Sequence, residues 1–269
     1  MLILYHGATS VCSQKVRLGL AELGLAYEGH LLDLMTGDQF DPDYLKLNPN
    51  AVVPTLVDDG MVVIESSLIL EYLDETYNAG GLMPADPDLK AKTKLWLLRC
   101  LAIHGAINSL SFATVNRAKQ MAGKTPEQLE TMLRKIPDPI SREKRRDLLD
   151  NGVASIHVEA ALREMRSAFA DMKVTLERYD WVSGPGYGLA DIALLAYIDR
   201  LDRLAMNGLW EDEFPEVSGW LERSKKRDSY RTAIASFLDP SAAENMYRTA
   251  VTFWPAISRT WSDIRNGPG

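Results

Sequence analysis

The sequence predicts an α/β domain followed by an all-helical domain. Short apolar strands and a hairpin signal occur only in about the first 65 residues, whereas the chain beyond Asp88 has helical spacing throughout. Between these regions, "NAGGLMPADP" (78–87) is rich in Gly and Pro, as linkers are. We expect a β-α-β unit, a hairpin and a helix over residues 1–78, a linker over 79–87, helices over 88–240 and a C-terminal extension over 241–269.

The first domain is predicted from alternating patterns. "LILY" (2–5) is a short apolar strand, residues 13–23 have helical spacing, and "YEGHLLDL" from Tyr27 is again strand-like. A short helix is expected in "FDPDYLKLNP". The runs "LV" and "MVVI" flank Asp58-Asp59-Gly60, which holds the Asp-Gly pair favoured in tight hairpins, and a helix is expected over 66–77.

The second region contains helices of unequal length. A long helix is expected through "LKAKTKLWLLRCLAIHGAINSL", followed by a polar excursion that includes "KIPDPISREKRR". Another helix is expected over about 155–179, and shorter ones near Leu189, Phe214 and Tyr230. Cys100 and His104 share a face of the long helix, where packing is a simpler explanation than a metal site without further ligands.

Composition limits the classes of function. The pI near 5.2 argues against nonspecific nucleic-acid binding, although the charge is uneven: residues 1–80 carry net −9 and the remainder net +2. The start "MLILYHG" is too short for a signal peptide, and we expect no membrane-spanning segment, so a cytoplasmic location is predicted. Two cysteines cannot form a disulfide framework, and both are expected to be reduced thiols.

Three motifs carry a resemblance to a known family. They are "NPNAVVPTL", "DDGMVVIESSLILEYL" at the appropriate distance after it, and "GLADIALLAY" in the helical region. With these motifs the chain resembles the cytosolic glutathione transferases, which join a thioredoxin-like domain to a helical domain. The resemblance implies glutathione as co-substrate, no metal, and a homodimer.

The polar segment 125–152 resembles one subgroup more closely. An "IP" segment followed by basic residues is similar to an insertion in the bacterial glutathione-dependent β-aryl etherases. The basic run 142–146 can be interpreted as a solvated helix face or as a flap or dimer element beside the active cleft.

The resemblance also implies a glutathione-binding set. The Val53-Pro54 bond would be cis and would present the backbone of Val53 to the cysteinyl part of glutathione. Glu65 would help to hold the γ-glutamyl amine and Ser66 its carboxylate, at a helix N-terminus suited to anions. Val52 stands where the family often has Gln or Lys, and Gln39 is a candidate for the glycyl carboxylate instead.

Three residues of "TSVCSQKVRLGLAELGL" are candidates for contact with a thiolate at a helix N-terminus, where dipole and free N–H groups favour the anion. By resemblance, Ser10 matches the serine of zeta-like enzymes, Cys12 the cysteine of beta-like enzymes, and Ser13 the position used in β-aryl etherases. Lys15 occupies the fourth position of a would-be C-x-x-C motif, which excludes dithiol chemistry. Cys12 is either catalytic or a small buried apolar residue.

These features predict a transferase in which a serine-stabilised glutathione thiolate attacks an apolar, aromatic electrophile, with cleavage of lignin-type β-aryl ethers as one version. On the long helix, His104, Asn108 and Phe112 are candidates to line the second-substrate pocket. Two alternatives stay open: a Cys12-dependent glutathione lyase or thiol reductase, and a non-catalytic interaction module of the same fold. "FWPAISRTW" (253–261) caps the cleft or packs on the surface.

Overall fold

The computed structural model describes residues 1–136 and 138–267. By the grouping of contacts, the chain forms two compact units, each assembled from three segments. The first unit consists of 1–101, 172–199 and 216–239, and the second of 102–171, 200–215 and 240–269. These contact-based units do not follow the domain boundaries expected from the sequence, which stay a prediction.

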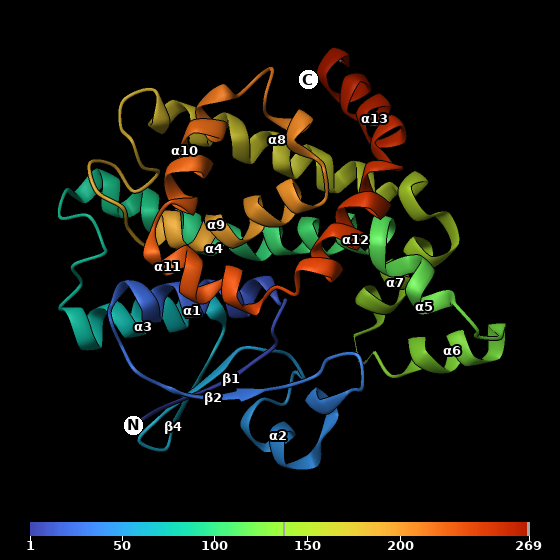
Figure 1. The fold of residues 1–269 in the computed structure, drawn as a ribbon, viewed down its shortest axis with the longest axis horizontal. Coiled ribbons are helices and arrows are strands. Elements are labelled where there is room, and N and C mark those ends of the chain that lie inside the picture. Colours follow the sequence, from blue (N-terminus) through green and yellow to red (C-terminus); the bar gives the residue numbers. More distant parts are fainter. Residues whose placement is uncertain (137, 268–269) are drawn as a thin grey trace. The chain divides into compact units, whose positions relative to one another are not determined.

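The first unit contains a mixed four-stranded sheet in the order β2-β1-β3-β4 (Figure 1). β1 and β2 are parallel, whereas β3 is antiparallel to both β1 and β4. The order of elements is the predicted β-α-β unit, hairpin and helix, so the α/β expectation is confirmed. The bounds are β1 Leu2–His6, α1 Val11–Glu22, β2 Glu28–Leu31, α2 Pro42–Leu47, β3 Thr55–Asp58, β4 Met61–Ile64 and α3 Ser66–Asn78.

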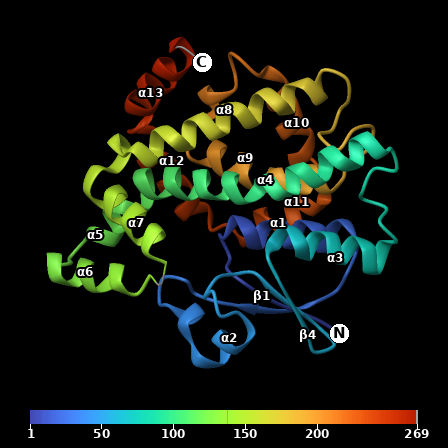
Figure 2. The same ribbon diagram turned by 180° about the vertical axis from the view of Figure 1, so that it is seen from behind.

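The core of the sheet lies beneath α1 and α3, which pack side by side against one face, while α2 lies on the other (Figures 1 and 2). The alternation of Leu2 and Leu4 with Ile3 and Tyr5 turns the two leucines toward α1 and α3. This buried cluster comprises Leu2, Leu4, Val16, Leu20, Leu56, Val63, Ile69 and Leu73.

The hairpin turn follows the sequence prediction. Asp59 and Gly60 both have positive φ, 46° and 89°, as a two-residue turn with the twist of the flanking strands requires. This turn fixes the register of β3 and β4 and therefore the place where each strand ends.

The remaining chain is helical, as expected. α4 crosses from the first unit into the second and ends in a turn of π-helix over Phe112–Asn116. The helices are α4 Pro87–Ser111, α5 Arg117–Met121, α6 Pro126–Arg134, α7 Pro139–Asn151, α8 Ile156–Leu176, α9 Leu189–Arg203, α10 Pro215–Lys225, α11 Asp228–Ala233, α12 Pro240–Val251 and α13 Trp254–Asn266.

The start of α9 explains the glycine in "GLADI". A Cβ at Gly188 would lie 2.4 Å from the carbonyl oxygen of Leu82, so no larger residue fits there. The hydroxyl of Ser183 instead accepts a hydrogen bond from the Ala190 N–H. The fully buried carboxylate of Asp191 accepts hydrogen bonds from three backbone N–H groups and from Trp220 Nε1. Ser183 and Asp191 therefore bind the N–H groups that a serine or threonine cap would otherwise bind.

In the second unit the C-terminal extension packs into the structure. Ile257, Trp261 and Ile264 of α13 are buried. The indole of Trp254 occupies the space beside Gly208, where a Cβ would lie only 2.3 Å from the ring. Within the segment 253–261, Ile257 and Trp261 thus belong to the core of this unit, whereas Pro255 and Arg259 are exposed.

The helical span Pro87–Met121 meets the length and composition criterion for a membrane helix. The sequence pattern alone predicted no such segment, so this expectation differs from the finding. About 56% of the residues in its apolar window are buried, and core helices of soluble proteins also pass the same test.

Candidate active site

The strand register brings the predicted site segments to one end of the sheet. Tyr5, Thr55 and Ile64 lie opposite one another on β1, β3 and β4. The turn that follows β1, the Val53-Pro54 bond that precedes β3 and Glu65 that follows β4 therefore leave the sheet at the same end. β2 runs parallel to β1, so the segment leading to Gln39 leaves from that end as well.

The turn between β1 and α1 is held by the guanidinium of Arg17. It donates hydrogen bonds to the carbonyl oxygens of Gly7 at 3.1 Å, Ala8 at 2.8 Å and Ala233 at 2.8 Å. It also contacts Nδ1 of His6 at 3.0 Å and lies 3.9 Å from the centre of the Phe237 ring. Burial lowers the pKa of Arg17 to about 10, which leaves it charged at neutral pH. The turn is thus fixed in place before any ligand binds.

Ser10, Cys12 and Ser13 differ in accessibility. Ser13 is fully buried, and its hydroxyl accepts a hydrogen bond from the Gly7 N–H at 3.1 Å. Ser10 is half-buried at the N-cap of α1, where its hydroxyl accepts from the Ser13 N–H at 3.3 Å. Cys12 is also half-buried, with Sγ 3.7 Å from the Tyr197 hydroxyl. Ser10 and Cys12 are therefore the two candidates that can be reached from outside.

The amino group of Lys15, which was not among the predicted site residues, lies buried behind the turn. The fully buried amino group of Lys15 donates a hydrogen bond to Ser67 Oγ at 3.0 Å and lies 5.1 Å from the centre of the Tyr197 ring. Burial raises the pKa of the Cys100 thiol, while the positive charge of Lys15 acts in the opposite direction. Burial likewise raises the pKa of Tyr197, so its hydroxyl is neutral. This cluster links α1 to the first turn of α3.

In the sequence, Lys15 stands out only because it occupies the position of the second cysteine in a C-x-x-C motif that begins at Cys12. The signal for its role was present in the sequence, since a basic residue stands four positions after Val11 and three before Leu18 on a buried face of α1. Such a residue is expected to have a specific partner, because a buried charge without one is costly.

The loop before β3 has the predicted cis bond between Val53 and Pro54. Beneath it, the carbonyl oxygen of Val52 accepts hydrogen bonds from the Tyr44 hydroxyl and from Asn48 Nδ2. Both partners also bind Thr55 Oγ1, at 2.9 and 3.0 Å. The Val52 side chain is exposed, so the network holds this loop through its backbone.

The N-terminus of α3 is open. Its N-cap is Glu65, not Ser66, and Glu65 makes no capping hydrogen bond with its side chain. The first N–H groups of α3 lack intrahelical partners, as at any helix start, and its first turn carries no acidic residue. Glu65 is exposed and has φ 70° and ψ 108°, a conformation that L-amino acids rarely adopt. This strained residue directs the chain into a helix start that suits an anion.

Gln39 lies in a single turn of 3₁₀-helix over Asp38–Phe40. It is half-buried, and among the described residues none donates a hydrogen bond to its Oε1 atom. This oxygen is buried and is an acceptor, so a contact with a ligand carboxylate would come from the amide N–H of Gln39, which stays a candidate.

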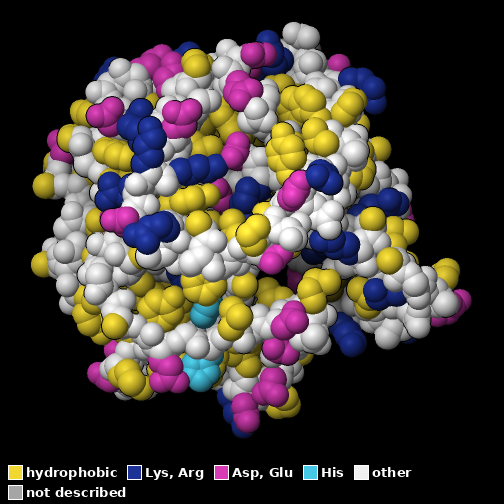
Figure 3. All heavy atoms as spheres, viewed as in Figure 1, with side chains coloured by type: hydrophobic (Ala, Val, Ile, Leu, Met, Phe, Trp, Pro, Cys, Tyr) yellow, Lys and Arg dark blue, Asp and Glu magenta, His cyan; other side chains and the backbone are white. Residues whose placement is uncertain are grey.

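A cavity beside the sheet does not coincide with these residues. It has a volume of about 840 Å³ and lies beside the edge strand β2, with Tyr5 stacked on His30 at 4.7 Å in its wall. None of the predicted glutathione residues lines it. Acidic side chains gather over α2 and the segment before it (Figure 3), and Asp38, Asp41 and Asp43 line the cavity. These carboxylates disfavour an anionic peptide such as glutathione. The N-termini of α1 and α3 suit such a ligand better than this cavity does.

The three residues expected to line a second-substrate pocket have different environments. Asn108 of α4 is exposed, His104 of α4 is half-buried, and Phe112, which begins the π-helical turn after α4, is only 1% exposed. Their lining of a second-substrate pocket stays a prediction.

A four-stranded mixed sheet with a cis-proline loop and helices on its faces is a thioredoxin-like domain. Family comparisons agree: the sequence model of the glutathione S-transferase N-terminal domain matches residues 9–76, and that of the C-terminal domain matches residues 150–228. Glutathione S-transferase Z2 of Arabidopsis thaliana is 32% identical over 234 residues, which cover 87% of this chain and 90% of the relative. The chain belongs to the glutathione transferase family.

Two further relatives come from bacteria. Protein LigF of Sphingobium sp. (strain NBRC 103272 / SYK-6) is 29% identical over 262 residues, covering 92% of this chain and 96% of LigF. Tetrachloro-P-hydroquinone reductive dehalogenase of Sphingobium chlorophenolicum is 29% identical over 244 residues, covering 86% and 94%. The crystal structure of the β-etherase LigF has a TM-score of 0.77 to this chain at 27% identity, covering 87% of this chain and 99% of LigF. The comparisons thus confirm that the relatives of this chain include a β-etherase, as the resemblance implied.

Proposed function

We propose that this chain is a glutathione transferase whose glutathione thiolate attacks an apolar, aromatic electrophile. The observation that carries the proposal is the pair of helix starts, α1 and α3, that leave the same end of the sheet as the cis Val53-Pro54 bond. Glutathione has a thiolate and a γ-glutamyl carboxylate, and the N-terminus of a helix suits each of them.

The proposed contacts divide glutathione into three parts. Ser66 and the free N–H groups of α3 bind the γ-glutamyl carboxylate, and the exposed carboxylate of Glu65 binds the amine. The backbone of Val53, before Pro54, pairs with the cysteinyl part. Gln39 donates a hydrogen bond from its side-chain amide N–H to the glycyl carboxylate.

For the thiolate, accessibility favours Ser10 over Ser13. Lowering the pKa of the glutathione thiol by two units needs about 2.7 kcal/mol. A charge-assisted hydrogen bond contributes about 1.5 to 3 kcal/mol and a helix terminus about 0.3 to 1 kcal/mol. One hydroxyl at the N-cap of α1 therefore suffices, and Ser13 keeps the turn in place through its hydrogen bond with Gly7.

The class of electrophile is proposed from the relatives. One is described as a reductive dehalogenase of a chlorinated hydroquinone and another as a β-etherase. In the etherase version, the thiolate attacks the carbon next to a ketone and a phenolate leaves. Catalysis is then mainly proximity and stabilisation of the thiolate. A cytoplasmic location agrees with the need for reduced glutathione.

The test is phenol release from a β-aryl ether ketone, with and without glutathione. We compare the wild type with Ser10→Ala, Cys12→Ala and Ser13→Ala. Glutathione-dependent release that falls at least tenfold in Ser10→Ala alone supports the serine mechanism. Unchanged turnover in the Ser10 and Ser13 single variants and in their double variant contradicts it.

A second candidate function rests on Cys12, whose thiol is accessible and lies 3.7 Å from the Tyr197 hydroxyl. A lyase or thiol reductase would pass through a mixed disulfide between Cys12 and glutathione. Mass spectrometry of the protein after exposure to oxidised glutathione tests this route, since a gain of one glutathione that is absent in Cys12→Ala supports it. Failure to bind glutathione at millimolar concentration would instead favour the non-catalytic interaction module.

The proposed homodimer has a candidate surface on α4. Leu95, Leu98 and Leu101 are 62%, 70% and 70% exposed and recur at every third position, with Leu68 of α3 also exposed. Such a contiguous apolar stripe is typical of an interface. A second copy of the chain would cover it by two-fold symmetry.

A further inference from the structure

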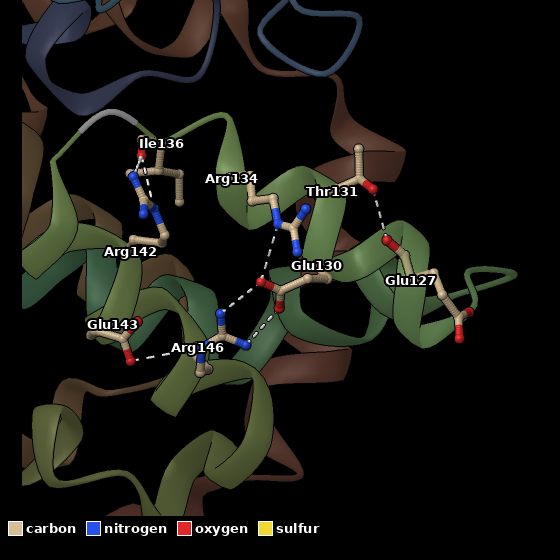
Figure 4. Close-up of polar contacts among 8 residues, drawn as sticks. All are labelled: Glu127, Glu130, Thr131, Arg134, Ile136, Arg142, Glu143 and Arg146. Carbon is tan, nitrogen blue, oxygen red and sulfur yellow. Dashed lines mark hydrogen bonds and ion pairs between the residues drawn. The ribbon is translucent and has the colours of Figure 1, made fainter.

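Helix α7 carries four basic residues within five positions, and two of them have clear structural partners. Figure 4 shows Arg146 bound through both nitrogens to the Glu130 carboxylate, at 2.7 and 3.1 Å. The same view shows Arg142 donating to the carbonyl oxygen of Ile136 from Nε at 3.1 Å and Nη2 at 2.8 Å. Glu143 is the one fully exposed residue of the run 142–146, so the expected solvated face is only partly present.

The other two basic residues contact α4 and the π-helical turn. The guanidinium carbon of Arg145 lies 4.0 Å from the centre of the Phe112 ring. Lys144 donates a hydrogen bond from Nζ to the carbonyl oxygen of Gly105 at 3.1 Å. Within the described residues 1–136 and 138–267, neither side chain forms an ion pair with a carboxylate.

Lys144 and Arg145 are adjacent positive charges without a paired carboxylate among the described residues. Burial lowers the pKa of both groups, and the charge of Arg145 lowers the pKa of Lys144 further. Two adjacent, half-buried cations repel each other and have lost part of their hydration, a cost that a bound anion would offset. Arg146, one position away, has Glu130 for this purpose. π-Helical turns, such as the one beginning at Phe112, often occur at functional sites.

The geometry favours a carboxylate as the missing anion. The Arg145 guanidinium lies over the Phe112 ring, and a guanidinium can offer a carboxylate a forked, two-point hydrogen bond. Lys144 adds a second positive charge beside it. We propose that Lys144 and Arg145 bind the carboxylate of a small aromatic anion, with the Phe112 ring beside the site. The aromatic part of this assignment rests on the Phe112 ring, whereas the anion site rests on the contacts of α7.

The experiment measures binding of benzoate, acetate and neutral benzamide to the full chain by isothermal titration at fixed ionic strength. Wild type is compared with Arg145→Gln and with Arg146→Gln as the matched control. We expect saturable benzoate binding, at least tenfold weaker in Arg145→Gln and within twofold of wild type in Arg146→Gln. Benzamide should not bind measurably. Benzoate should bind several-fold more tightly than acetate.

The outcomes separate this proposal from the proposed function. Benzoate affinity that is unchanged in Arg145→Gln, or benzamide binding as tight as benzoate, overturns the anion site. Equal affinity for acetate and benzoate overturns the aromatic assignment. If Arg145→Gln does not fold, Lys144→Gln must show the same loss of benzoate binding. Glutathione is titrated into the same samples: its binding without carboxylate binding overturns only this inference, whereas failure to bind glutathione overturns the proposed function.

Discussion

Glu65 combines a strained backbone with a proposed ligand contact. Residues with such φ and ψ values cost about 1 to 3 kcal/mol and persist where the surrounding structure holds them. We predict that Glu65→Gly raises the free energy of unfolding by about 1 kcal/mol, because glycine lacks the Cβ that makes a positive φ costly. The same change should weaken glutathione binding at least tenfold, since it removes the carboxylate. Urea denaturation and isothermal titration measure the two effects.

Ala79→Gly is the matched control for that substitution. Ala79 has φ 49° at the C-cap of α3, at the opposite end of the helix from the proposed ligand. Glycine there should also stabilise the protein, with glutathione affinity unchanged. Equal loss of affinity in both variants would show that Glu65 has no specific contact.

His6 predicts a pH dependence of stability. Burial, with a smaller contribution from Arg17, lowers its pKa from 6.5 to about 4. The unfolded chain therefore binds a proton on His6 near pH 6.5 that the folded chain binds only near pH 4, so stability falls as the pH drops through this window. Relative to a His6→Asn variant, wild type should lose about 3 kcal/mol between pH 7 and pH 4. Parallel pH profiles of the two unfolding free energies would contradict this.

At the scale of single residues, the family resemblance led to the cis Val53-Pro54 bond, which the structure has. It also led to Glu65, whose ligand contact stays a proposal. It could not tell that Ser13 is buried or that Lys15 contacts Ser67, since these depend on how α1 packs against α3. Which face of a helix is buried depends on the elements that pack against it, and the spacing of apolar residues along the helix does not determine it alone.

At the scale of elements, the contact between Trp254 and Gly208 couples α13 to the short turn after α9. Gly208→Ala should destabilise the protein by about 1 to 3 kcal/mol, because an aromatic ring 2.3 Å from the new Cβ has to move. In a Trp254→Leu background the cost should be much smaller. Chemical denaturation of the two single variants and the double variant measures this coupling.

Gly186→Ala serves as the control, since nothing lies within 4 Å of a Cβ at that position. Its unfolding free energy should stay within about 0.5 kcal/mol of the wild type. An equal effect of both alanines would mean that the Trp254 contact does not restrict Gly208.

The elements themselves were largely predictable. The hairpin followed from Asp59-Gly60, and the helix starts at Pro126 and Pro139 follow from Thr125 and Asp138, which cap them with their side chains. What the pattern could not give was the role of α7, because its basic residues are divided between ion pairs, a backbone carbonyl and an aromatic ring on other helices. A run of charged residues, taken from the sequence alone, favours the interpretation as a solvated helix face.

At the scale of the whole molecule, the leucine stripe on α4 predicts self-association. Replacing Leu98 with Glu should convert a dimer to a monomer, because a charge would be buried at the centre of the stripe. Sedimentation velocity measures the change directly. Val174→Glu, at another exposed apolar position, should leave the dimer intact. A wild type that sediments as a monomer would contradict the proposed interface.

The two-part organisation was only partly visible in the sequence. The change from strands to helices near residue 80 is a local property and could be read directly. The grouping of 172–199 and 216–239 with the sheet could not, because it depends on contacts between segments more than 100 residues apart.

The contacts of Arg17 have a consequence for the order in which the protein is made. Its guanidinium binds Ala233 and stacks on Phe237, more than 200 residues later in the chain. During translation, the turn before α1 therefore lacks part of its support until residues 233–237 have left the ribosome. A nascent chain stalled before residue 233 should expose this turn to proteases.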